Sequence, residues 1–317
     1  MPNIPTISLS NRLIARKVTF FLIFTCLTNL VQAETLHVRL VMSDSTPPYQ
    51  QFSVALNKAL VENNADVTII ESQADAASRS NGGAKIDLVI AVGMKATEFA
   101  ITDFDAPLLS TMIPRAGYEM LREKHSSLRS SNAVSAIYLD QPWERQLSFI
   151  RAALPRHSVV GVLYSPDTPI VLPRLPQGMS LNAKSVSSAK TLFATLENIL
   201  NSSDVLLVIP DSEIYSSSNV RNILLASYRQ RVPLIGVSQA YVNAGALCAI
   251  FSTPEQLAEQ VAKAIISFSS DRQLPGPQYP ESFSIGINNQ VARSLGIEIA
   301  SPDVIRKRME KAGEGGQ

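Results

Sequence analysis

The chain has few of the residues from which catalytic and metal sites are commonly built. Its 317 residues include three histidines, two cysteines and one tryptophan. His37, His125 and His157 are far apart, and no cysteine is spaced with them as a metal ligand would be. Gly-x-Gly-x-x-Gly and P-loop motifs are absent, and the stretch Gly236–Ala240 lacks the second glycine of a nucleophile elbow. The sequence therefore predicts a protein that is not an enzyme and holds no cofactor and no metal.

Cysteine is too scarce to stabilise the fold covalently. Cys26 lies in the apolar N-terminal run, so its loss with that run would leave Cys248 as the single thiol, with no intramolecular disulfide. Cys248 stands in an apolar stretch, which favours a buried and inert side chain over a reactive one. With 45% hydrophobic residues, the chain can form one or two hydrophobic cores.

The first 33 residues have the layout of a secretory signal peptide. Arg12, Arg16 and Lys17 precede the apolar run 18–31. Val31 and Ala33 then provide small residues at the −3 and −1 positions of a cleavage site. We expect cleavage after Ala33 and export to the periplasm; an uncleaved anchor is the alternative. Cleavage takes the formal charge from +1 to −2, which indicates no nucleic-acid partner. No later apolar run reaches about 18 residues, so no membrane span is expected after the signal.

After Glu34, short β-branched runs alternate with longer amphipathic segments, which is typical of α/β proteins with mainly parallel sheets. The expected strands are 36–41, 67–70, 87–92, 107–111 and 133–138, followed by 159–163, 205–209, 233–236, 247–251 and 283–287. The expected helices are near 52–60, 95–100, 142–154, 189–199, 220–229, 254–265 and 288–295. Two series of similar size predict two doubly wound lobes.

Proline marks several boundaries. Thr253 is a candidate N-cap with Pro254 in the first turn of the following helix. Four prolines between 165 and 178 forbid a regular helix there, so we expect an extended surface excursion. Residues 271–280 form a Pro/Gly linker.

Six stretches of the chain together resemble the ABC transporter substrate-binding family related to tryptophan- and tyrosine-binding periplasmic proteins. These stretches are Ala136–Pro142, Val162–Pro166, Ile209–Ser212, Tyr228–Gly236, Tyr241–Leu247 and Ile287–Ala292. The similarity covers residues 132–298, with a looser match over 36–131. It implies the type I periplasmic binding protein fold, in which two lobes are joined by a three-segment hinge.

The resemblance also implies where the chain crosses between lobes: near 138–141, 251–254 and 278–282. The expected domains are a signal peptide at 1–33, lobe 1 at 34–138 plus 252–279, lobe 2 at 139–251 plus 280–300, and a C-terminal tail at 301–317. The first half departs from amino-acid binders of the family at Gly93–Ala96 and Asn132–Ser135, so the resemblance does not predict the ligand.

Ligands of open parallel sheets bind beyond the carboxyl ends of the strands, where helix N-termini and loop amides converge. Two lobes that face each other would form a cleft that closes on the ligand. The candidate ligand-binding residues are Ser43, Asp44, Ser45, Gly93, Met94, Ser110 and Thr111 in lobe 1, Tyr138 near the hinge, and Ser165, Asp211, Ser212 and Ser238 in lobe 2.

Each prominent polar or aromatic side chain could instead cap, pack or remain solvated without contacting a ligand. The Ser43–Ser45 cluster could receive a ligand ammonium or cap the next helix, and Asp211 could bind an amine or cap its own loop. Asp140 is expected to be an N-cap. Trp143 could stack on a ligand or pack inside lobe 2, and Lys95 could pair with a ligand carboxylate or remain solvated.

The sequence thus predicts a periplasmic solute-binding protein that captures a small organic ligand, with an amino-acid-like ligand as one candidate, and passes it to an ABC permease. The alternative is a ligand-sensing or structural periplasmic protein of a signalling or secretion system that feeds no transporter. Both would use the same fold, so the fold cannot separate them.

Overall fold

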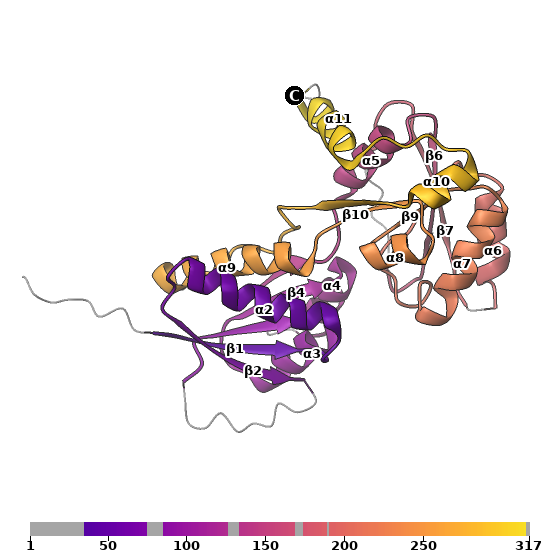
Figure 1. Ribbon diagram of the computed structural model, residues 1–317. Coiled ribbons are helices and arrows are strands. Elements are labelled where there is room, and N and C mark those ends of the chain that lie inside the picture. Colours follow the sequence, from indigo (N-terminus) through magenta and orange to yellow (C-terminus); the bar gives the residue numbers. More distant parts are fainter. Residues whose placement is uncertain (1–34, 75–84, 126–132, 169–173, 189, 315–317) are drawn as a thin grey trace, which may run out of the picture. The chain divides into compact units, whose positions relative to one another are not determined.

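The computed structural model describes residues 35–74, 85–125, 133–168, 174–188 and 190–314, and the chain from Leu36 onward forms one unit. The expected signal peptide lies outside the described residues. Two separate sheets, each built mainly from parallel strands, organise this unit (Figure 1).

The first sheet has five parallel strands in the order β2-β1-β3-β4-β5. Its strands are β1 (Leu36–Met42), β2 (Val67–Gln73), β3 (Leu88–Val92), β4 (Leu108–Ile113) and β5 (Val134–Tyr138). Every residue of β3 is buried because helices cover both faces of the sheet. The central position of β3 in the sheet therefore explains why its sequence is apolar throughout.

Four helices pack on this sheet: α2 (Pro47–Glu62), α3 (Met94–Asp103), α4 (Arg115–Lys124) and α9 (Pro254–Asp271). Helices α2 and α9 lie side by side over one face, where Leu56 and Val261 join the core with Leu40. Helix α3 covers the other face through Ala96 and Ala100. Helix α9, which is distant in sequence, thus completes the first lobe.

The second sheet has six strands in the order β11-β10-β9-β8-β6-β7. Its strands are β6 (Val159–Tyr164), β7 (Ser180–Ser185), β8 (Val205–Leu207), β9 (Leu234–Gly236), β10 (Cys248–Phe251) and β11 (Ser284–Ile287). All neighbours are parallel except β10 and β11, which pair antiparallel. Strand β11 follows α9 and the linker after it, so it enters the second sheet from the first lobe.

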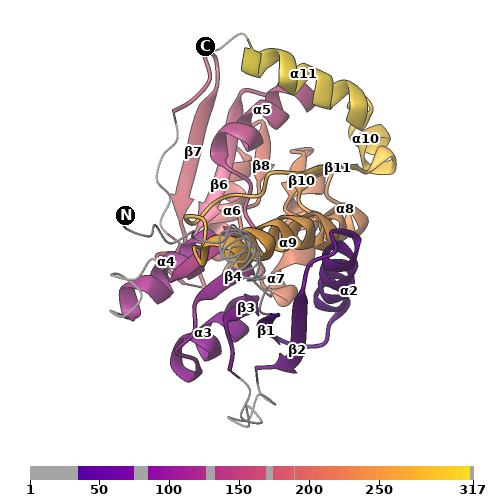
Figure 2. The same cartoon turned by 90° about the vertical axis from the view of Figure 1, so that its left-hand side faces the viewer.

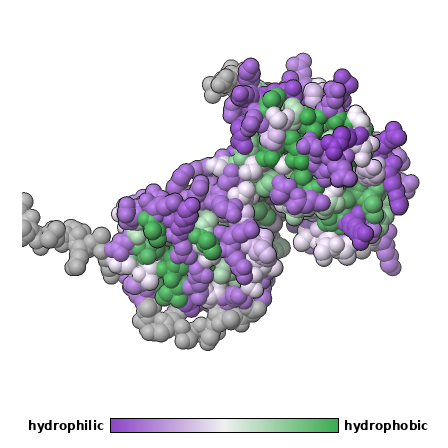
Figure 3. All heavy atoms as spheres, in the orientation of Figure 1, coloured by the Kyte–Doolittle hydropathy of each residue, from purple (hydrophilic) through white to green (hydrophobic). Residues whose placement is uncertain are grey.

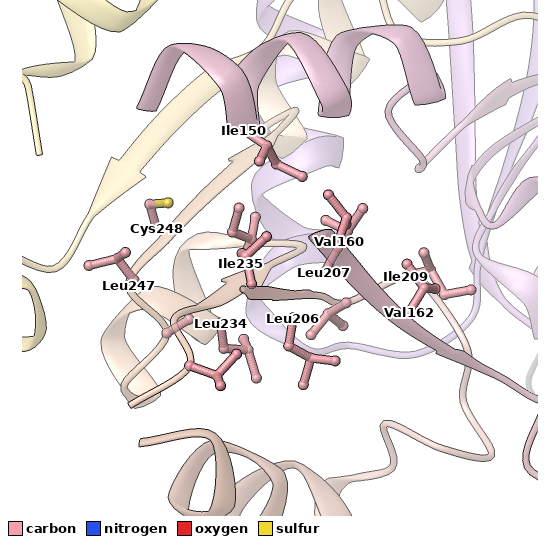
Figure 4. Packing of buried hydrophobic residues seen from close by; sticks show 14 of the residues in the cluster. Ile150, Val160, Val162, Leu206, Leu207, Ile209, Leu234, Ile235, Leu247 and Cys248 are labelled. Carbon is pink, nitrogen blue, oxygen red and sulfur yellow. The ribbon is translucent and has the colours of Figure 1, made fainter. Parts of the chain in front are cut away.

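Six helices belong with the second sheet: α5 (Trp143–Ala153), α6 (Leu192–Leu200), α7 (Ser217–Arg229), α8 (Gln239–Ala244), α10 (Asn289–Leu295) and α11 (Pro302–Glu314). Their core is aliphatic, and Figure 4 shows Ile150 of α5 above Val160, Leu207 and Ile235 of the sheet. Cys248 lies in the same core, and burial raises the pKa of its thiol far above the ordinary value. The cysteine is therefore buried, as expected.

The chain passes between the two lobes three times, which confirms the three-segment hinge. It leaves the first sheet after β5 to enter α5, returns after β10 to form α9, and leaves again to form β11. The capping box of α9 is present as expected. Thr253 Oγ1 accepts from Gln256 N at 3.2 Å, and Gln256 Oε1 accepts from Thr253 N at 3.0 Å.

The structure adds four elements for which the sequence patterns had predicted no helix or strand: α4, β7, α8 and α11. Strand β7 is a half-exposed edge strand of polar sequence, so it lacks an apolar period. Helix α11 lies in the segment expected as a C-terminal tail, and it packs against α5 through Ile305 and Met309 (Figure 2). Between 174 and 178, the proline-rich segment forms no regular helix, as expected.

Figure 3 shows one face of the molecule, coloured by hydropathy. Hydrophilic side chains dominate the face seen in Figure 3, and apolar side chains show between them in patches. Among the described residues, no helix combines the length and the apolar character that crossing a membrane requires.

Candidate functional site

A cavity of about 450 Å³ opens where α4, the β5–α5 crossing and two loops of the second sheet meet. An adjacent cavity of about 470 Å³ shares part of its wall, including Met120, Asp167 and Pro210. We refer to the two together as the cleft. Both volumes fall in the range of small-molecule sites. The cleft is lined from both lobes at the carboxyl ends of parallel strands, where the topology predicted a site.

Helix α4 supplies the first lobe's wall. Arg115, Ala116, Glu119, Met120 and Glu123 line the cavity from this one helix. The sequence pattern predicts no helix here. The segment is rich in charged residues and its buried side consists of Tyr118 and Leu121 alone, so it has few apolar residues by which a helix could be recognised.

The backbone before α4 contains a β-bulge. The pairing of β4 with β5 shifts register between Thr111 and Ile113, and Met112 between them has a left-handed φ of 51°. Pro114 then stands at the N-cap. This bulge sets the direction in which α4 starts.

Asp140, at the first hinge crossing, caps α4 from a distance in sequence. Its Oδ2 accepts a hydrogen bond from Arg115 N at 2.5 Å. We had expected Asp140 to be an N-cap, but it caps the preceding helix and not α5, whose N-cap is Pro142 with no side-chain cap bond. Burial raises the pKa of Asp140 to about 6, against the lowering effect of this backbone hydrogen bond.

Three tyrosines stand beside α4. Tyr138 contacts Tyr118 and Tyr279, with ring centroids 5.8 and 5.3 Å apart. Tyr138 Oη also donates to Glu119 Oε1 at 3.3 Å, and Tyr279 Oη accepts from Arg115 Nη1 at 2.8 Å. Burial raises the pKa of Tyr118 to about 12 and that of Tyr138 further, so both phenols are neutral. This cluster fixes the orientation of Arg115 and Glu119 at the cavity wall.

The second lobe's wall comes from the loops after β6 and β8 together with the start of α5. Pro166, Asp167 and Thr168 follow β6, and Ile209 and Pro210 follow β8. A turn closed by Thr168 N to Ser165 O at 3.1 Å shapes the first of these loops.

Three aromatic side chains complete that wall. Trp143 lines the first cavity and also packs against the core of the second lobe, so both of its proposed roles are compatible with its position. Tyr215 and Tyr241 line the second cavity, opposite Met94 of α3.

Among the predicted site residues, Met94, Asp211 and Ser212 line the cleft. The others are not among the lining residues of the two cavities within the described part of the chain. They are Ser43, Asp44, Ser45, Gly93, Ser110, Thr111, Tyr138, Ser165 and Ser238.

Ser43 and Gly93 shape the start of α3. Ser43 Oγ accepts from Ala96 N at 3.0 Å, which caps that helix from the end of β1. Gly93 precedes the helix with a φ of +91°, and a Cβ there would lie 2.5 Å from Ser43 Oγ. Asp44 Oδ1 accepts from Thr46 N at 2.7 Å in a local turn, and Ser45 is exposed.

Asp211 is fully engaged with backbone amides. Its Oδ2 accepts from Ser165 N at 2.7 Å, while Oδ1 accepts from Glu213 N and Ile214 N at 3.1 and 3.0 Å. The carboxylate therefore connects the loops after β6 and β8 and shapes the wall that both provide. This arrangement favours the capping role of Asp211 over its binding of a ligand amine.

The remaining candidates are hydroxyls near strand ends. The hydroxyls of Ser110, Thr111 and Ser165 are buried and have no hydrogen-bond partner among the described residues. Ser238 is the N-cap of α8 without a side-chain cap bond. Lys95 is exposed on α3. The described residues contain no group of three or more His, Cys, Asp or Glu side chains that could hold a metal ion.

Comparison with solved structures relates the fold to binding proteins. A conserved domain protein from Vibrio cholerae is 16% identical, with a TM-score of 0.59, over 87% of this chain and 98% of that one. An ABC domain from Streptococcus pneumoniae in complex with L-Trp is 16% identical, with a TM-score of 0.58 and the same coverage. A ligand-free, open substrate-binding protein with adhesive properties from Clostridium difficile is 15% identical, with a TM-score of 0.63, over 84% and 96%.

These similarities show the fold, which is that of the two-lobed periplasmic binding proteins. No curated protein matches the chain. The family described as "ABC transporter substrate binding protein" matches residues 52–310, which is most of the chain and includes both lobes. The protein therefore belongs to the ABC transporter substrate-binding protein family.

Proposed function

We propose that the protein is a periplasmic solute-binding protein that captures a small organic ligand in the cleft and delivers it to an ABC permease. The observation that carries this proposal is the shared wall of the cleft. Glu119 and Met120 of the first lobe line the same cavity as Asp167 and Ile209 of the second. A ligand bound there contacts both lobes and stabilises the closed arrangement, whereas a ligand held by one lobe would not.

The lobe assignment follows the sheet membership. We infer that lobe 1 contains residues 34–138 and 252–279, and that lobe 2 contains 139–251 and 280–300, with α11 packed onto it. Closure would then turn about the three crossings and leave each core intact, because each sheet keeps its own helices. The proposed binding residues are those that line the cleft, with the hydroxyl and carboxylate groups behind them in supporting positions.

A ligand screen tests this proposal directly. The purified protein is titrated with amino acids, amines, organic acids, nucleosides and sugars, and its unfolding temperature is recorded. A ligand of the native state at about 100 times its Kd stabilises by about 2.7 kcal/mol, a shift of several degrees. Small-angle X-ray scattering of the liganded protein should show a smaller radius of gyration.

Two results would count against the proposal. The absence of any stabilising compound would contradict solute binding and favour a structural role. Binding without compaction would contradict closure between the lobes. Transport itself is tested by growth on the bound solute in cells that lack this protein and in cells that retain it.

A further inference from the structure

We propose that the ligand of the cleft is a small organic cation, namely an amine with an apolar or aromatic body. This inference rests on the proposed function, because it assigns a chemical class to the solute of that same cleft. It follows from the charges and the aromatic groups that the structure gathers there.

The charged residues that line the first cavity are mostly acidic. Glu119, Glu123, Asp140 and Asp167 provide four carboxyl groups, and Arg115 provides the one guanidinium among the described lining residues. The whole chain, by contrast, carries almost equal numbers of acidic and basic residues. Negative charge is thus concentrated at the cleft, which favours a positively charged ligand and disfavours an anion.

The guanidinium of Arg115 is already held by protein groups. Its Nη1 donates to Tyr279 Oη at 2.8 Å, and its Cζ lies 5.8 Å from the centroid of the same ring. The hydrogen bond from Arg115 to Tyr279, assisted by the nearby Glu119, raises the pKa of this guanidinium. The guanidinium is therefore already hydrogen-bonded within the first lobe.

The carboxylates stand on both sides of the cavity. Glu119 and Glu123 belong to α4 of the first lobe, where Glu119 also pairs with Arg122 Nη1 at 3.2 Å, while Asp167 belongs to the loop after β6 in the second. A cation between them would be attracted by both lobes at once. A ligand favours closure only if it binds the closed state more tightly than the open state, and contacts with both lobes provide that difference.

The uncharged part of the wall suits an apolar ligand body. Trp143 and Tyr279 present aromatic rings to the cavity, and Met120, Ile209 and Pro210 add apolar surface. Aromatic faces also attract cations, with Trp the strongest of them. An amine attached to a ring or to a short hydrocarbon matches this combination better than a sugar does.

The test compares three compounds that share one body and differ in charge. Tyramine carries the amine alone, tyrosine carries both amine and carboxylate, and 3-(4-hydroxyphenyl)propionate carries the carboxylate alone. Binding is measured by isothermal titration calorimetry at low salt with the purified protein; tryptamine, tryptophan and indole-3-propionate form a second series. We expect the amine of each series to bind most tightly and the acid not to bind.

Charge-neutralising variants locate the site of the cation. Asp167→Asn and Glu123→Gln each remove one carboxylate from one wall and keep the size of the side chain. We expect about tenfold weaker amine binding from each. Glu197→Gln on α6 makes the same charge change at an exposed position, so it should bind amines as the unmodified protein does.

The outcomes separate this inference from the proposed function. If the acids bind as tightly as the amines, or if neither cleft variant weakens the amines, the cationic ligand is wrong while solute binding stands. If all six compounds and the wider screen give no binding, solute binding fails as well. Amine binding that is weakened by both cleft variants, but not by Glu197→Gln, supports the inference.

Discussion

Gln141 Nε2 donates a hydrogen bond to Ser252 Oγ at 2.9 Å, and this bond joins two of the three crossings between the lobes. Ser252 Oγ in turn donates to Ser282 O of the third crossing at 2.6 Å. Arg145 Nη1 extends the network to Gln141 Oε1 at 2.7 Å and to Pro280 O at 2.8 Å. The hinge is therefore one connected set of hydrogen bonds whose central hydroxyl is buried.

The first prediction concerns that hydroxyl. Ser252→Ala leaves Gln141 Nε2 and Ser282 O without this partner, so we expect a loss of about 1–3 kcal/mol in the free energy of unfolding. Urea denaturation measures the change. Ser269→Ala makes the same substitution at an exposed position of α9 and should change stability by less than about 0.5 kcal/mol. Equal effects from the two variants would mean that the hinge bonds add no stability.

A second prediction concerns Asp211. Asp211→Ala removes the acceptor of hydrogen bonds from the backbone amides of Ser165, Glu213 and Ile214. The bonds from Ser165 and Ile214 are buried. We expect a loss of at least about 2 kcal/mol, measured by thermal or urea unfolding. Asp44→Ala is the matched change, because Asp44 accepts one exposed amide, and it should cost under about 1 kcal/mol. A stable Asp211→Ala protein would contradict this structural role.

Gly93 supports a third prediction. Alanine at this position would have a positive φ and a Cβ 2.5 Å from Ser43 Oγ and 2.6 Å from Tyr49 Oη. We expect Gly93→Ala to destabilise the protein by about 1–3 kcal/mol, measured as a lowered Tm. Gly276→Ala meets no atom within 4 Å and should be tolerated. If both variants melt at the same temperature, the close approach of β1 to α3 is not a constraint.

The fourth prediction is a pH dependence at Asp140. Burial raises its pKa in the folded protein to about 6, above the value of about 3.9 in an unfolded chain. The folded state thus binds the proton more tightly, so the contribution of Asp140 to stability falls as pH rises from about 4 to about 6. Asp140→Asn keeps an oxygen for Arg115 N but carries no charge. We expect it to raise Tm at about pH 7.5 and to change nothing at about pH 3.5.

Asp204→Asn is the control for that experiment and has the opposite sign. Burial alone would raise the pKa of Asp204, but hydrogen bonds from Val159 N, Ser158 N and Ser158 Oγ lower it overall. Its ionised form stabilises the fold above the unfolded pKa, and that stability is lost as pH falls through the lowered value. Asp204→Asn should therefore lower Tm near neutral pH. If both substitutions change Tm near neutral pH in the same direction, the conclusion that folding raises the pKa of Asp140 is contradicted.

Most of the fold could be predicted because its strands are buried and its helices amphipathic. Strand β3 is apolar throughout since both its faces are covered, and the capping residues of α9 are visible in Thr253 and Pro254. Helix α4 was not predicted, because few of its residues are apolar. Its start depends on the bulge at Met112 and on Asp140, and neither produces a local helix signal.

The cleft lies at the edge of the sheets where the site was predicted, and three of the predicted residues line it. Met94, Asp211 and Ser212 line the cleft, whereas Ser43 and Asp44 accept backbone amides at turns and helix starts. Small polar residues after strands serve caps and ligands equally well, so their type alone cannot separate the two roles.

The sequence by itself determined the class of the fold, the two α/β series, the buried strands and the absence of common catalytic motifs. These properties are local, because hydrophobic periodicity and capping act over a few residues. Only the tertiary structure decided which residues face the cleft. Arg115, Glu119 and Tyr279 become neighbours of Asp167 through the bulge before α4, the cap from Asp140 and the three crossings. Those contacts join residues that are far apart in sequence, so no local pattern records them.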